Sequence, residues 1–138
     1  SDPAMVENFK PNYHRVLDQG VDLLFCNHDE ARLLTGADSV EDCAHHLKEI
    51  CPTFVITCGK DGSLGFDGKD ISRIDGVPTH AVDTTGAGDI FSGAFLYSLC
   101  QGKNFAAAAD LANRSASLMV ASFGARLSQS DVTKYLQD

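Results

Sequence analysis

The chain has 138 residues, 43% of them hydrophobic and 22% charged, and it carries a formal net charge of -8. These proportions are typical of one soluble globular domain built around a single core, and they exclude a disordered chain. A surface that follows a nucleic-acid backbone needs clustered Lys and Arg, whereas the eleven basic residues are scattered. No apolar stretch is long enough to span a bilayer. We therefore expect neither nucleic acid nor a membrane as a partner.

The cysteines predict no covalent framework. There are five of them, an odd number, and they include no C-x-x-C pair, so neither a set of disulfides nor a zinc site is indicated. Cys26 and Cys58 lie in or next to apolar runs, where a cysteine usually behaves as a small buried hydrophobe. A reducing compartment, the cytoplasm, is the expectation that follows.

The first part of the chain predicts helical turns, a strand and two short helices. Residues 3–17 have the pattern of helical turns. Residues 21–26 form a short apolar run, the pattern of a strand buried on both faces. Residues 31–34 predict a short helix, and a second helix, capped by Ser39, is predicted to continue to about residue 50.

The second part of the chain predicts a strand, a hairpin and three helices. Residues 54–57 predict a buried strand, and residues 63–66 and 70–74 predict a hairpin that turns at Asp67 and Gly68. Helices are predicted at residues 87–99, 105–120 and 130–136. This order predicts an α/β sheet flanked by helices, with functional residues at the carboxyl ends of its strands. Because the strands are so few, we expect the rest of the sheet to lie upstream of this chain.

Residues 83–89, with the sequence D-T-T-G-A-G-D, place two glycines between two carboxylates immediately before an apolar helix. The first N–H groups of a helix have no partner within it, and the helix dipole adds partial positive charge there. Glycines let a phosphate approach closely, so the amides of Gly86, Ala87 and Gly88 are predicted to form an anion hole. Asp89 lies beside these amides and is a candidate base for the proton of an attacking hydroxyl.

Two other phosphate motifs are absent, and a structural interpretation of the loop stays open. A Walker A loop requires G-x-x-x-x-G-K-[ST], and a dinucleotide fingerprint requires glycine at the position of Phe91; the chain has neither. The seven residues would also suit a tight strand-to-helix turn with Asp89 as a capping carboxylate. The full string ahead of an apolar helix favours phosphoryl transfer.

The string D-T-T-G-A-G-D resembles the C-terminal signature D-T-x-G-A-G-D of the ribokinase-type, or PfkB, carbohydrate and nucleoside kinases. Asn27 and Glu30 resemble the family's N-x-x-E motif, which implies roles in the network around magnesium and the phosphates. Thr57, Gly59 and Gly62 resemble its T-x-G-x-x-G loop, which implies contacts with the nucleotide. Taken alone, these residues would suit a helix cap and ordinary turn glycines.

The end of the chain carries the remaining parts of this resemblance. Asn113 is similar to a residue on the adenine side of the nucleotide site, although by itself it would suit an exposed position in a helix. Residues 124–128 resemble a monovalent-cation segment, which implies a potassium site. The oxygens that line it would come from Asp83, Thr85, Gly124 and Ser128. Ser128 would equally suit the N-cap of the last predicted helix.

The resemblance implies a ribokinase-like three-layer fold, of which residues 1–138 hold the C-terminal catalytic and nucleotide-binding part. The family's N-terminal acceptor-binding part and lid have no counterpart here, so we expect little or no kinase activity from these residues alone. The implied reaction transfers the γ-phosphoryl group of ATP, with Mg²⁺ and K⁺ as cofactors, to a hydroxyl of a sugar or nucleoside, the adenosine-kinase-like branch being favoured. A non-catalytic nucleotide-binding or assembly module, an incidental Gly-rich turn and a homodimer all stay open.

Overall fold

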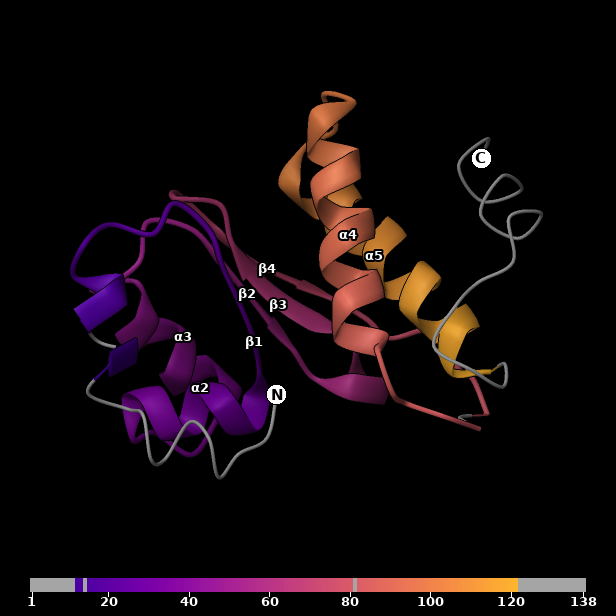
Figure 1. The fold of residues 1–138 in the computed structure, drawn as a ribbon, viewed down its shortest axis with the longest axis horizontal. Helices are drawn as coiled ribbons and strands as arrows, with labels where there is room; N and C mark the ends of the chain where they lie inside the picture. The colour runs from indigo at the N-terminus through magenta and orange to yellow at the C-terminus, as the bar shows by residue number, and fades with distance from the viewer. Residues whose placement is uncertain (1–11, 14, 81, 122–138) are drawn as a thin grey trace. The chain divides into compact units, whose positions relative to one another are not determined.

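The computed structural model describes residues 12–13, 15–80 and 82–121 (Figure 1). The chain separates into two compact units: one runs up to Gly59 and includes Ser63–Arg73, and the other contains Lys60–Gly62 and the chain from Ile74 onward. Most of the predicted helical segment at residues 3–17, and all of the helix predicted at 130–136, lie outside the described residues. None of the helices in the described ranges is long and apolar enough to cross a membrane.

Most of a mixed four-stranded sheet lies in the first unit. Its strands, in spatial as well as chain order, are β1 (Leu24–Asn27), β2 (Phe54–Thr57), β3 (Ser63–Phe66) and β4 (Ile71–Ile74). β1 and β2 are parallel, whereas β2 and β3 are antiparallel. A parallel pair needs a crossover connection, and here the connection forms two helices, α2 (His28–Thr35) and α3 (Val40–Leu47). This arrangement confirms the predicted α/β class.

Helices α2 and α3 pack on the sheet and enclose the core of the first unit (Figure 1). Phe54 and Ile56 are two residues apart on β2, so they lie on the same face of the strand, and both are completely buried. They cluster with Leu47 of α3 and Phe66 of β3, and the ring centres of Phe54 and Phe66 are 5.6 Å apart. Burial of each such side chain contributes about 1.5–3 kcal/mol, which holds both helices against the strands.

The two short helices follow the start and stop signals of the sequence. Ser39 caps α3 as predicted, because its hydroxyl oxygen accepts the N–H of Asp42 at 3.0 Å. α3 ends at Leu47, short of the predicted residue 50. α2 stops before Gly36 as expected from the glycine, but it begins three residues earlier than predicted because Asn27 caps it.

The strand predicted at residues 21–26 is shifted along the chain. β1 begins at Leu24, and Cys26 is the only buried residue among its four. Before Leu24, the carbonyl oxygen of Asp22 accepts the side-chain hydroxyl of Thr53 in place of a strand hydrogen bond. Cys26 lies on one face of the strand and the other three residues are only half-buried, so the prediction of a strand buried on both faces is wrong.

The hairpin of β3 and β4 turns one residue later than predicted. Asp67 flanks the turn, because its N–H donates to the carbonyl oxygen of Asp70 at 3.3 Å. The carboxylate of Asp67 accepts the N–H groups of Asp70 and Lys69, each at 2.8 Å, and these bonds lower the pKa of that carboxyl. The reversal of the chain therefore occurs at Gly68 and Lys69.

The second unit is built on two helices that pack against each other, α4 (Ala87–Cys100) and α5 (Phe105–Val120) (Figure 1). α5 has the predicted bounds, and α4 ends one residue later than predicted. Phe95 of α4 is completely buried. Its ring centre is 6.2 Å from that of Phe91 on α4 and 4.8 Å from that of Phe105 on α5. These aromatic contacts fix α4 on α5.

The five cysteines are free thiols. Cys26 is buried and Cys100 is exposed. Burial, reinforced by the charge of Glu30, raises the pKa of Cys26 far above its ordinary value, so its reactive thiolate is scarce. We expect iodoacetamide at pH 8 to label Cys100 first and Cys26 only after unfolding in denaturant, as followed by peptide mass spectrometry. Equal labelling rates at the two thiols of the native protein would contradict this burial.

Candidate active site

Residues 83–85 form a tight turn that is held at two places. The carboxylate of Asp83 accepts the N–H of Thr85 at 2.9 Å. The N–H of Asp83 donates to the carbonyl oxygen of Val120 at 3.2 Å, and that of Val82 donates to the same oxygen at 2.7 Å. Val120 is the last residue of α5, where carbonyl groups have no partner within the helix. The end of α5 therefore anchors the start of the loop.

The turn is stable at neutral pH. The backbone N–H of Thr85, together with its hydroxyl, lowers the pKa of Asp83 below the ordinary value of 3.8. A carboxyl group whose pKa is lower in the folded than in the unfolded protein stabilises the folded state at pH values above its unfolded-state pKa. This stabilisation is lost as the pH falls through the lower pKa of the folded state. Because the carboxylate is exposed to solvent, this contribution to the free energy of unfolding is small.

The N-terminus of α4 presents open backbone N–H groups. Gly86 has a φ of +80°, in the left-handed region that glycine adopts without strain, and it leads into α4 with no side-chain cap. Of the three amides predicted to form an anion hole, that of Ala87 donates to the carbonyl oxygen of Thr84 at 3.2 Å. Across the described ranges, the N–H groups of Gly86, Gly88 and Asp89 have no hydrogen-bond acceptor.

The first turn of α4 also carries a carboxylate. Asp89 lies there with an exposed side chain, which has no hydrogen-bond partner among the residues that the structure describes. The space beside Gly88 is open, because a Cβ placed on it would meet no atom within 4 Å. The arrangement puts a proton acceptor next to open amides at the positive end of a helix, where an anion is stabilised.

Asn27 and Glu30 form a reciprocal cap at the N-terminus of α2. The side-chain oxygen of Asn27 accepts the N–H of Glu30 at 2.8 Å, and Glu30 Oε2 accepts the N–H of Asn27 at 2.9 Å. The structural interpretation of these two residues is thus confirmed. Glu30 is only 9% exposed, so its carboxylate has a fixed orientation at the carboxyl end of β1.

Thr57 lies beside this cap. It is the last residue of β2 and pairs with Asn27 in the parallel register of β1 and β2. Its hydroxyl donates to the carbonyl oxygen of Cys26 at 3.5 Å. Two residues predicted from separate motifs therefore meet at the carboxyl ends of adjacent parallel strands, the edge where α/β sheets bind ligands.

The loop after β2 forms a single 3₁₀ turn, Gly59–Asp61. The exposed residues Lys60 and Asp61 occupy it, and Gly62 follows with a φ of +91°. Thr57 and Gly59 belong to the first unit, whereas Gly62 belongs to the second.

Asn113 lies in α5 and is 8% exposed. The alternative of an exposed position in a helix is therefore wrong. Its side-chain Nδ2 donates to the carbonyl oxygen of Ile74 at 3.4 Å. Asn113 thus contacts the chain that leaves β4.

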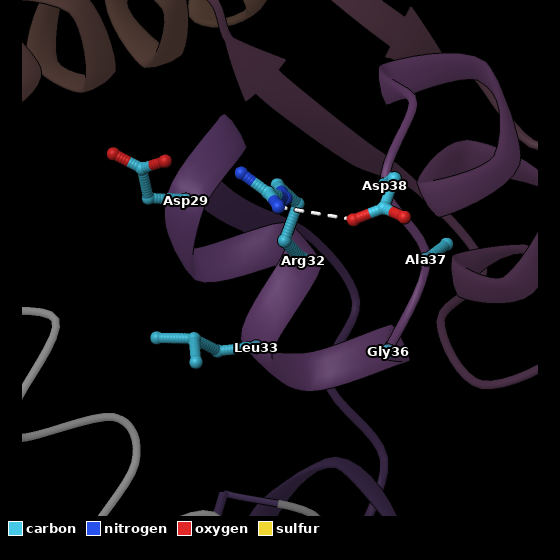
Figure 2. Close-up of a pocket in the computed structure, with 6 residues that line it drawn as sticks. All are labelled: Asp29, Arg32, Leu33, Gly36, Ala37 and Asp38. Atoms are coloured by element: carbon cyan, nitrogen blue, oxygen red, sulfur yellow. Dashed lines mark hydrogen bonds and ion pairs between the residues drawn. The ribbon is translucent and has the colours of Figure 1, made fainter.

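A shallow hollow of about 380 Å³ lies on the first unit, against α2. Figure 2 shows the ion pair in it, in which Arg32 Nη2 and Asp38 Oδ1 are 3.0 Å apart. Asp29 and Leu33 of α2 also line it, but none of the predicted site residues does. Both partners of the ion pair are well exposed, so the pair contributes little stability.

The structure brings the predicted residues together in two groups. In the first unit, Asn27, Glu30 and Thr57 meet at the ends of β1 and β2. In the second unit, residues 83–89 form one loop at the start of α4. Gly124 and Ser128 lie outside the described residues. Within the described ranges, no three His, Cys, Asp or Glu side chains gather as a metal site.

Sequence reasoning missed the contact between the loop and Val120. The end of a helix signals that its carbonyl groups need donors, and this signal was present at the predicted end of α5. The sequence pattern at the end of a helix does not identify the distant N–H groups that will donate to its carbonyl oxygens. In this chain the donors are the N–H groups of Val82 and Asp83.

Solved kinase structures resemble this chain over nearly all of its length. Adenosine kinase from Sinorhizobium meliloti matches 99% of the chain with a TM-score of 0.91 and 27% identity, and the chain covers 42% of it. Ribokinase from Arabidopsis thaliana, solved with ribose and ATP, matches 91% of the chain with a TM-score of 0.77 and 28% identity, and the chain covers 43% of it. The chain therefore has part of the ribokinase-like α/β fold.

The sequence model of the pfkB family of carbohydrate kinases matches residues 1–132, and the chain belongs to this family. The ribokinase of Staphylococcus aureus (strain COL) is 36% identical over 115 residues, which are 78% of this chain and 38% of that protein. The chain thus spans less than half the length of these relatives.

Proposed function

We propose that the protein is an ATP-dependent phosphotransferase that moves the γ-phosphoryl group of ATP to a hydroxyl of a sugar or nucleoside. The observation that carries this proposal is the N-terminus of α4, where the open N–H groups of Gly86 and Gly88 stand beside the carboxylate of Asp89. Membership of the pfkB family supports it. So do relatives that are named ribokinase and adenosine kinase, one of them solved with ATP.

The open amides fit a phosphoryl group. Gly86 and Gly88 have no side chains, and the space beside Gly88 is free of other atoms, so an anion can reach the N–H groups. Together with the helix dipole, these groups would stabilise the charge that develops on the phosphoryl oxygens. The hydrogen bond between Ala87 and Thr84 at 3.2 Å holds the turn in the shape that exposes the neighbouring amides.

Asp89 is proposed as the general base. Its carboxylate would accept the proton of the acceptor hydroxyl while the hydroxyl oxygen bonds to the γ-phosphorus of ATP and ADP departs. It is exposed and has no competing hydrogen bond within the described part of the chain. An exposed carboxylate with no competing hydrogen bond suits a base that acts only after the acceptor has bound.

Glu30 is proposed to contribute to the binding of Mg²⁺, which neutralises phosphate charge when it is bound. Its carboxylate is buried and oriented by the N–H of Asn27. We expect Glu30→Gln to keep this hydrogen bond, because glutamine also serves in a capping box, and to lower stability by less than about 1 kcal/mol. The Mg²⁺ concentration for half-maximal activity should rise about tenfold or more, as for groups that orient metal ligands.

The matched control for Glu30 is Asp42, which occupies the same third helical position in α3 and bonds to its own cap, Ser39. Asp42→Asn should leave the Mg²⁺ dependence unchanged. A Glu30→Gln protein with normal Mg²⁺ dependence would restrict Glu30 to capping and remove it from the proposed site.

The other proposed roles rest on the same resemblance. Thr57 and Gly59 would contact the nucleotide at the carboxyl end of β2. Asp83 and Thr85 would supply oxygens for a K⁺ ion, together with Gly124 and Ser128. The hydrogen bond between the Asp83 carboxylate and the N–H of Thr85 fixes the turn of residues 83–85. A fixed turn suits a cation site, because the oxygen ligands are then held in position before the ion binds.

The test is an assay of the full-length protein with ATP, Mg²⁺ and a panel of sugar and nucleoside acceptors. Formation of a phosphate ester on one acceptor, with one ADP per ester, is the expected result. Residues 1–138 alone should give little turnover, because orientation of the acceptor and exclusion of water need more than these elements. Tight ATP binding without transfer to any acceptor would instead favour a non-catalytic nucleotide-binding module.

A further inference from the structure

The backbone between Lys60 and Gly62 crosses the backbone between Ile74 and Gly76 in very close contact. A Cβ placed on Gly76 would lie 2.7 Å from the carbonyl carbon of Lys60 and 2.8 Å from the nitrogen of Gly62, and nearer still to the carbonyl oxygen of Lys60. A Cβ on Gly62 would lie 2.5 Å from the nitrogen of Gly76 and 2.6 Å from the carbonyl carbon of Asp75. All of these neighbours are backbone atoms, which cannot rotate away as a side chain can. The crossing therefore excludes every residue but glycine at positions 62 and 76.

We propose that Gly76 is a positioning residue for ATP, which holds the nucleotide loop in place by permitting this crossing. The inference rests on the proposed function, since it takes residues 57–62 as the nucleotide loop. It also gives Gly62 a role different from direct contact with the nucleotide, because Gly62 is the second glycine that lets the two backbone segments cross. Gly76 lies outside the T-x-G-x-x-G, N-x-x-E and D-T-x-G-A-G-D motifs, so none of them assigns it a function.

Asn113 links the crossing to α5. Its side chain is buried and donates to the carbonyl oxygen of Ile74, two residues before Gly76. Helix α5 thereby holds the segment that leaves β4, and this segment in turn supports Lys60–Gly62. The resemblance places Asn113 on the adenine side, and this chain of contacts gives it a way to influence ATP binding through the backbone.

The first test compares Gly76→Ala with Gly93→Ala in the full-length protein. Gly93 is a matched control, because a Cβ placed on it would meet no atom within 4 Å. Displacement of the loop should raise the KM for ATP about tenfold or more, the scale of a small misplacement of a binding group. The KM for the acceptor should stay within about twofold of the wild type, because the crossing lies on the nucleotide loop. Gly93→Ala should change neither constant.

A second pair of variants separates the crossing from backbone strain. Gly62 and Gly20 share a φ of +91°, but a Cβ on Gly20 would meet no atom within 4 Å. Alanine suffers the same left-handed strain at both positions, so a larger effect of Gly62→Ala on the KM for ATP isolates the crossing. Equal effects of Gly62→Ala and Gly20→Ala would overturn the inference.

A third measurement needs no variant and covers the case in which Gly76→Ala does not fold. Hydrogen exchange of the wild-type protein should slow at residues 74–76 as well as at 60–62 when ATP and Mg²⁺ are added. Protection confined to residues 60–62 would overturn the inference.

Limited trypsin digestion needs no nucleotide, so it tests the crossing even if the protein transfers no phosphate. Cleavage after Lys60 should be faster in Gly76→Ala than in Gly93→Ala. Equal cleavage would refute the crossing itself, independently of the proposed function.

Discussion

Replacement of Asp89 by asparagine should lower kcat by about 10²–10⁴, the usual contribution of a general base. Asparagine has nearly the same shape as aspartate but cannot accept the proton of an acceptor hydroxyl. The N–H groups of Gly86 and Gly88 do not depend on this side chain, since each has no acceptor in the described structure. The dissociation constant for ATP should therefore change little. Steady-state kinetics and equilibrium binding of ATP to the same preparation measure the two quantities.

The control for Asp89 is Asp110, an exposed acid of α5 that forms an ion pair with Arg114, with Oδ2 and Nη2 2.8 Å apart. Asp110→Asn removes one negative charge from the same unit, and it should leave kcat within about twofold because exposed ion pairs contribute little. Near-normal turnover by Asp89→Asn would remove Asp89 from the role of base. A loss of ATP affinity equal to the loss of kcat would instead assign it to binding.

Truncation of Phe95 to alanine should have the largest effect on stability, about 3–5 kcal/mol of the free energy of unfolding. Its side chain is completely buried, and its ring contacts those of Phe91 and Phe105. Removal of the ring leaves a cavity between α4 and α5 and deletes the aromatic contact between the helices. Urea unfolding, followed by circular dichroism, measures the change.

Two comparisons control for Phe95. Phe95→Leu fills part of the cavity and should cost clearly less than Phe95→Ala. Lys103, between α4 and α5, is exposed, and Lys103→Ala should stay within about 0.5 kcal/mol of the wild type. A loss of less than about 1 kcal/mol in Phe95→Ala would mean that the contact between α4 and α5 does not depend on this ring.

The elements that could be predicted from the sequence are those whose signals are local. α5 has the predicted bounds because its apolar positions repeat at helical spacing and Asn104 caps it, accepting the N–H of Ala107 at 2.9 Å. β2 also has the predicted bounds, because Phe54, Val55 and Ile56 form a short apolar run, and all three are completely buried.

Predictions that depended on competing hydrogen bonds were less accurate. The hairpin moved by one residue because the side chain of Asp67 accepts two backbone N–H groups, an option that the favoured Asp-Gly turn does not include. α2 gained three residues at its start because Asn27 and Glu30 cap each other. In both cases a side-chain oxygen competes with backbone carbonyl groups for backbone N–H donors. Local geometry, rather than composition, then decides where the turn or the helix begins.

The candidate site could be predicted only in part. Its local pieces, the turn at Gly86 and the cap at Asn27, follow from glycine and asparagine at those positions. Other contacts join residues that are distant in sequence: the bond from Asp83 to Val120, which anchors the loop before Gly86, and the crossing of Gly62 with Gly76 after β2. No periodicity or motif identifies such partners, because they depend on how elements far apart in the chain pack.

The most direct test of phosphoryl transfer at the N-terminus of α4 is a titration of the ¹⁵N-labelled full-length protein with a non-transferable ATP analogue and Mg²⁺, followed by NMR. If the amides receive the γ-phosphoryl group, the N–H resonances of Gly86 and Gly88 should move downfield as new hydrogen bonds form, while that of Ala87, already bonded to Thr84, should move much less. Saturable binding of the analogue with no change at Gly86 or Gly88 would contradict a phosphate site at this helix.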